Sequence, residues 1–75
     1  MEISIRLMGA FKAKTPASKK LSLADGATVA DALAALEIPG DHVQLVMVNN
    51  RLEHNHGCIL QPGDELMAMP PVGGG

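Results

Sequence analysis

The chain ends with Glu65-Leu66-Met67-Ala68-Met69-Pro70-Pro71-Val72-Gly73-Gly74-Gly75. Residues 65–69 predict a strand, and the prolines that follow cannot donate to a strand ladder. The glycines add no side-chain chemistry, but they present an unhindered backbone that finishes in a carboxylate. Fully extended, the chain from Pro70 onward reaches about 20 Å. We therefore predict a folded domain over residues 1–69 and a protruding tail over residues 70–75; a frayed terminus is the alternative.

Two stretches near the N-terminus, residues 2–8 and 19–23, alternate polar and apolar side chains. This period of two is typical of strands with one face on the core. The side chains predicted to point inward are Ile3, Ile5, Leu7, Leu21 and Leu23. With residues 10–17 as a wide loop, the two stretches form a predicted antiparallel hairpin.

A helix is predicted to begin at Thr28. Thr28 at the cap position and Asp31 three residues later resemble a capping box, although Glu or Gln is the usual partner. One apolar stripe follows at helical spacing and comprises Val29, Leu33 and Leu36. Pro39-Gly40 is predicted to end the helix.

The second half of the chain contains two more predicted strands. Residues 43–48 are nearly all apolar, which is typical of a strand covered on much of both faces. Asn49-Asn50 and residues 61–64 are turn signals, and residues 52–59 are irregular. The element order predicts an α+β fold in which one helix packs on a mixed sheet, although it allows more than one topology.

Composition narrows the classes of function. The 75 residues form one domain with a small core, which must be largely aliphatic because there is one Phe and no Trp or Tyr. A net charge of −2 with interspersed signs argues against nucleic-acid binding. One Cys excludes an internal disulfide, and no apolar run has membrane-spanning or signal-peptide character. We expect a cytoplasmic protein that binds neither nucleic acid nor membrane.

Three stretches resemble the MoaD/ThiS family of sulfur carriers. They are Val48-Asn49, Pro62-Gly63-Asp64-Glu65-Leu66 and Pro70-Pro71-Val72-Gly73-Gly74-Gly75. The resemblance implies a ubiquitin-like β-grasp fold, in which the first and last strands pair in parallel at the centre of the sheet. The hydrophobic strand followed by Pro-Pro-Val most resembles MoaD proteins, the small subunits of molybdopterin synthase.

The resemblance also implies what the tail does. An E1-like adenylating enzyme, using ATP and Mg²⁺, would convert the Gly75 carboxylate into an acyl-adenylate. A sulfur donor protein, commonly carrying a persulfide, would displace AMP and leave a thiocarboxylate. Gly73 and Gly74 would thread a narrow channel in the partner. The sulfur would pass to a precursor in a larger synthase subunit, either MoaE-like or a thiazole synthase.

On this interpretation the chain binds no cofactor and is no enzyme on its own, although it can be the small subunit of a sulfurtransferase. The leading hypothesis is a carrier for molybdopterin, and so molybdenum cofactor, biosynthesis. The alternatives are a ThiS-like carrier for the thiazole of thiamine, a ubiquitin-like protein modifier, and a β-grasp interaction module.

Partner binding is predicted for the residues that lead into the tail: Met67, Met69, Pro70, Pro71 and Val72. Strand alternation exposes either the two methionines or Leu66 and Ala68. If the methionines face outward, they form an adaptable apolar surface for docking. If they face inward, they fill the core in place of aromatic side chains. The sequence leaves both arrangements open.

His54, His56 and Cys58 alternate and would share one face of a strand. Imidazole and thiolate are zinc ligands, but no fourth ligand lies nearby. A solvated hairpin is the favoured interpretation, and no metal site is predicted.

Overall fold

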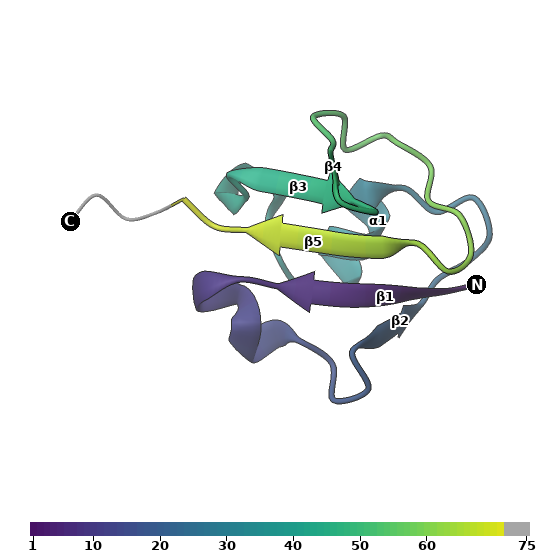
Figure 1. The fold of residues 1–75 in the computed structure, drawn as a ribbon, viewed down its shortest axis with the longest axis horizontal. Coiled ribbons are helices and arrows are strands. Elements are labelled where there is room, and N and C mark those ends of the chain that lie inside the picture. Colours follow the sequence, from purple (N-terminus) through teal and green to yellow (C-terminus); the bar gives the residue numbers. More distant parts are fainter. Residues whose placement is uncertain (72–75) are drawn as a thin grey trace.

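The computed structural model describes residues 1–71, which form one five-stranded sheet with a helix across one face (Figure 1). The strands are β1 (Glu2–Leu7), β2 (Lys20–Ser22), β3 (Leu45–Val48), β4 (Arg51–Leu52) and β5 (Glu65–Met69). Their spatial order is β2-β1-β5-β3-β4. β1 and β5 pair in parallel at the centre, and the other neighbours are antiparallel. This arrangement confirms the predicted mixed sheet and its parallel central pair.

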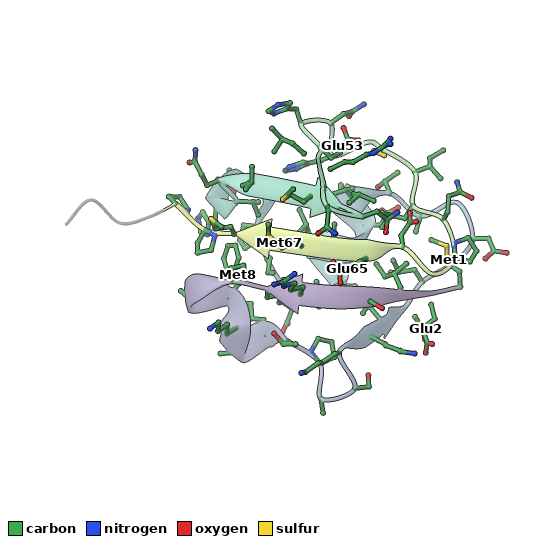
Figure 2. The ribbon with its side chains drawn as sticks, viewed as in Figure 1. Met1, Glu2, Met8, Glu53, Glu65 and Met67 are labelled. Atoms are coloured by element: carbon green, nitrogen blue, oxygen red, sulfur yellow. The ribbon has the colours of Figure 1, made fainter. Side chains whose placement is uncertain are left out.

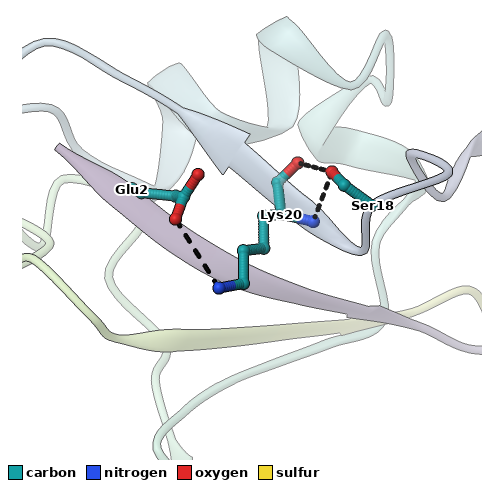
Figure 3. A network of polar contacts seen from close by, with 3 residues as sticks. All are labelled: Glu2, Ser18 and Lys20. Atoms are coloured by element: carbon teal, nitrogen blue, oxygen red, sulfur yellow. Dashed lines mark hydrogen bonds and ion pairs between the residues drawn. The ribbon is translucent and has the colours of Figure 1, made fainter.

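The N-terminal hairpin is confirmed, with a shorter second strand than predicted. Lys19 has a φ of 59° and belongs to the turn, so β2 begins at Lys20. Figure 3 shows the polar contacts of this strand: the Lys20 ammonium lies 3.6 Å from the Glu2 carboxylate. The Ser18 hydroxyl accepts a hydrogen bond from the Lys20 N–H and donates one to the Lys20 carbonyl, both at 3.3 Å.

The predicted loop over residues 10–17 contains a 3₁₀ helix, η1 (Gly9–Lys14), and the prediction was wrong there. Phe11 explains the difference, since its side chain is only 8% exposed and joins the core. Its N–H donates to the Met8 carbonyl at 3.1 Å, which closes a tight turn directly after β1. Burial of the one aromatic side chain therefore orders a segment that has no helical periodicity.

The helix α1 (Val29–Ala35) begins as predicted and ends earlier. Thr28 accepts a hydrogen bond from the Asp31 N–H at 3.2 Å, and Asp31 accepts one from the Thr28 N–H at 2.9 Å. Before Pro39-Gly40 is reached, Ile38 N–H donates to the Leu33 carbonyl at 2.9 Å and Glu37 N–H to the Ala34 carbonyl at 3.0 Å. This is a Schellman ending, with Glu37 in the left-handed region at a φ of 59°.

The core lies between the sheet and α1, and it is aliphatic except for Phe11. Its members are Ile3, Ile5, Leu7, Phe11, Val29, Ala32, Leu33, Leu36, Ile38, Val46, Leu60, Leu66 and Ala68. The predicted stripe of α1 is therefore confirmed, and Leu21 and Leu23 pack partly buried against the same core. The second 3₁₀ helix, η2 (Gly40–His42), joins α1 to β3.

The strand predicted over residues 43–48 begins at Leu45, and its face opposite α1 is less covered than predicted. Val46 is buried, whereas Leu45 and Met47 are only half-buried on the face opposite α1. In the irregular stretch 52–59, only Leu52 belongs to a strand, and Ile59 forms an isolated bridge with Thr28. Within residues 1–71, no helix has the length and apolar character that a membrane span requires.

Candidate functional site at the end of β5

The end of β5 is held from both sides. Met8 N–H, just past β1, donates to the Ala68 carbonyl at 3.0 Å, and Gln44 N–H, just before β3, donates to the Met69 carbonyl at 2.9 Å. Pro70 has no N–H and cannot extend the ladder. The chain therefore leaves the sheet at Pro70, between the end of β1 and the start of β3 (Figure 1). The remaining predicted tail residues, Val72, Gly73, Gly74 and Gly75, lie outside the described residues.

Burial decides which side chains of β5 face outward. Leu66 and Ala68 are both 0% exposed, whereas Met67 and Met69 are half-buried on the opposite face. The methionines therefore do not fill the core, and the outward arrangement is confirmed. In Figure 2, Met67 lies on the sheet face turned away from α1.

Strand register builds an apolar row around Met67. Met67 lies opposite Met47 of β3, and Met47 lies opposite Leu52 of β4. Met69 pairs in the same way with Leu45. We call Leu45, Met47, Leu52, Met67 and Met69 the outer-face patch. Four of these side chains are half-buried and Leu52 is 50% exposed, so the patch is accessible to a partner.

Three members of this patch, Leu45, Met47 and Leu52, are not predicted as a partner surface from the sequence. The apolar run 43–48 predicts a strand covered on much of both faces, and the sequence leaves Leu52 open between surface and core. No local signal identifies them, because side chains from β3, β4 and β5 share a face only once the register is set. Their composition suits docking, since methionine is unbranched and adapts its shape to different partners.

Asn49 and Asp64, which belong to the stretches that carry the family resemblance, form a polar clamp at the other end of β5. The Asn49 amide donates to the Asp64 carboxylate and accepts from the Glu65 N–H, both at 2.9 Å. The backbone N–H of Asn49 also donates to the Glu65 carbonyl at 2.9 Å. The Asp64 carboxylate accepts in addition from the Gln61 N–H at 2.8 Å. These residues fix where β5 begins and lie far from its exit.

The segment from His54 to Cys58 is not a strand, so its alternating side chains do not share a face. Gly57 N–H donates to the Asn55 side chain at 2.8 Å and Cys58 N–H to the Asn55 carbonyl at 3.0 Å, which turns the chain. Burial, and then the neighbouring Glu53 carboxylate, raise the pKa of the Cys58 thiol. Within residues 1–71, no three His, Cys, Asp or Glu side chains come together as metal ligands.

The sequence and the fold were compared with those of known proteins. The sequence model of the ThiS family matches residues 5–75. The chain belongs to the ThiS family. No curated protein sequence matches it significantly.

Two solved structures are similar over almost the whole chain. The crystal structure of SAMP1 from Haloferax volcanii is 27% identical with a TM-score of 0.73, and each chain is covered to 100%. A crystal structure of the H. volcanii small archaeal modifier protein 1 is 27% identical with a TM-score of 0.72, covering 95% of this chain and 98% of the other. The sheet and helix described above are thus the ubiquitin-like β-grasp.

Membership in the ThiS family sets the broad function. The family comprises ubiquitin-like sulfur carriers and modifiers. These small proteins act as carriers and are not enzymes themselves. Such proteins generally work with E1-like activating enzymes.

Proposed function

We propose that this protein is a sulfur carrier whose Gly75 carboxylate is adenylated and converted to a thiocarboxylate. The observation that carries the proposal is the exit of β5. Hydrogen bonds from Met8 and Gln44 fix the strand through Met69, and Pro70 and Pro71 then lead the chain off the sheet. The family match continues to Gly75, so the residues after this exit belong to the family's pattern.

The proposed mechanism divides the work between the folded domain and the tail. The outer-face patch docks on the E1-like enzyme, which supplies ATP and Mg²⁺. The Gly75 carboxylate attacks the α-phosphate and pyrophosphate leaves, which gives an acyl-adenylate. A persulfide sulfur of the donor protein then displaces AMP, and reductive cleavage of the resulting acyl disulfide by a thiol releases the thiocarboxylate. The side chains of this chain only dock and position the terminal carboxyl group.

We propose molybdopterin synthesis as the destination of the sulfur, together with a MoaE-like larger subunit as the acceptor protein. The Pro70-Pro71-Val72 approach to the glycines supports this choice over thiazole synthesis. The discriminating assay supplies the thiocarboxylate form either to a MoaE-like subunit with its pterin precursor or to a thiazole synthase with its own precursors. Sulfur transfer only in the second reaction would assign the chain to thiamine synthesis.

The similarity to SAMP1 supports a second candidate function. One of the matched structures is described as a small archaeal modifier protein, so the activated Gly75 of this chain could instead be joined to a lysine of a target protein. Conjugates of raised mass, carrying Gly75 in an isopeptide bond, would identify this role. They should accumulate in cells that express the full chain and disappear when Gly75 is deleted.

The first experiment is the intact mass of the protein purified from its own cells. Replacement of one terminal oxygen by sulfur at Gly75 is the expected result. Gly74→Val and deletion of Gly75 should leave the fold intact and abolish loading, whereas Ala17→Val, at an exposed position before β2, should load normally. Normal adenylation of either tail variant would contradict the proposal. Full function after truncation at Val72 would favour an interaction module.

A further inference from the structure

Gly9, the residue with which η1 begins, lies against the first residue of the exit. Its φ is +55°, in the left-handed region. A Cβ at this position would lie 3.1 Å from Cγ and 3.4 Å from Cδ of Pro70. The first distance is shorter than ordinary van der Waals contact, so a side chain at residue 9 would displace the Pro70 ring by a few tenths of an ångström. The absence of a side chain at residue 9 therefore lets the Pro70 ring lie this close to the turn.

The other left-handed glycines within residues 1–71 do not have this property. Gly26 and Gly63 have φ values of +85° and +84°, and a Cβ at either would meet nothing within 4 Å. At these two positions glycine is favoured only because the backbone φ is positive. Gly9 serves the backbone and also makes room for a residue that is distant in sequence.

The contact between Gly9 and Pro70 lies at the point where the chain leaves β5. Met8, next to Gly9, donates its N–H to Ala68, so the ends of β1 and β5 are fixed to each other. Pro70 is half-buried, whereas Pro71 is exposed. The turn after β1 therefore supports Pro70, the last half-buried residue within residues 1–71.

We propose that Gly9 is a positioning residue for the tail: it seats the Pro70 ring and so sets the direction in which the chain leaves the sheet. The inference rests on the proposed carrier function and adds a determinant outside the tail itself. A proline ring held on a glycine fixes the start of the tail before a partner binds. Ordering of this segment then costs less when the adenylating enzyme engages the terminus.

The direct test measures the direction of the tail without any partner. A nitroxide is attached to Ala13→Cys, an exposed position of η1, in a Cys58→Ser background. A methyl group at residue 9 should push Pro70 away from η1, so Gly9→Ala should reduce the paramagnetic relaxation enhancement at the Val72 amide. Gly26→Ala places alanine at another position of positive φ, with open space around it, and it should leave the enhancement unchanged. Equal enhancement in Gly9→Ala and the unmutated chain would overturn the proposal.

The functional test uses pyrophosphate exchange by the E1-like enzyme of the source organism. Gly9→Ala should raise the KM for the carrier by about two- to tenfold and leave kcat unchanged, because it removes preorganisation and not chemistry. In a Pro70→Ala background the ring atoms are absent, so Gly9→Ala should add no further increase. If the KM values of Gly9→Ala and Gly26→Ala are equal while the unmutated chain is adenylated, the positioning role of Gly9 is refuted and the carrier function stands. If the unmutated chain is not adenylated, the carrier function fails, and the relaxation experiment still decides the geometry.

Discussion

Replacement of Asn49 should show that this motif residue serves the fold and not the tail. Its side chain joins the turn after β3 to the start of β5 through hydrogen bonds with Asp64 and Glu65, each 2.9 Å long. Its φ of 53° is left-handed, which asparagine tolerates better than alanine does. Asn49→Ala therefore removes two hydrogen bonds and adds backbone strain at the same position.

The two effects have separable magnitudes. A hydrogen bond contributes about 0.5–1.5 kcal/mol net, so the loss of both costs about 1–3 kcal/mol. Strain of an alanine at left-handed φ adds about 1 kcal/mol. We expect Asn49→Ala to lower the free energy of unfolding by about 2–4 kcal/mol and Asn49→Gly, which relieves the strain, by about 1–3 kcal/mol. For a domain of this size, each kcal/mol lowers Tm by about 4–8 °C.

Urea unfolding of the purified variants measures these differences. Asn50→Ala is the matched control, because Asn50 has a φ of 66° in the same turn but makes no side-chain hydrogen bond within residues 1–71. It should lose only the cost of strain, about 1 kcal/mol. If Asn49→Gly is as stable as the unmutated chain, the clamp contributes nothing and the reasoning is refuted. Below the unfolding transition, tail loading per folded molecule should be unchanged in every variant.

Substitutions or chemical modification at three other sites give further predictions. Glu37→Gly should raise the free energy of unfolding by about 0.5–1 kcal/mol in urea, because glycine adopts the left-handed φ of a Schellman ending without strain. Cys58 should react with iodoacetamide more slowly at about pH 8 than in the urea-unfolded chain, since its raised pKa leaves less thiolate; Glu53→Gln, which removes a neighbouring negative charge, should speed the reaction. Met67→Glu should change stability by less than about 1 kcal/mol yet weaken adenylation, whereas Leu66→Ala, at a fully buried site, should cost about 2–4 kcal/mol in urea.

Local patterns in the sequence predicted the elements whose causes are local. Alternation located β1 and β2, and the pair Thr28 and Asp31 located the start of α1 through hydrogen bonds only three residues apart. The end of α1 escaped prediction, because Glu37 takes a left-handed φ where the strong signals, proline and glycine, come later. η1 escaped as well, since burial of Phe11 by distant elements orders it and no local repeat does.

The sequence by itself predicted the α+β fold, and it carried the family resemblance that the comparison confirmed. Chain order and hydrophobic period are sufficient for that, because they depend on neighbouring residues. Only the tertiary structure decided that Met47, Met67 and Leu52 share one accessible face. Only the tertiary structure also placed Pro70 against Gly9, which lies sixty-one positions earlier in the sequence. Strand register and parallel pairing create these contacts, and both are properties of the folded sheet that no single segment specifies.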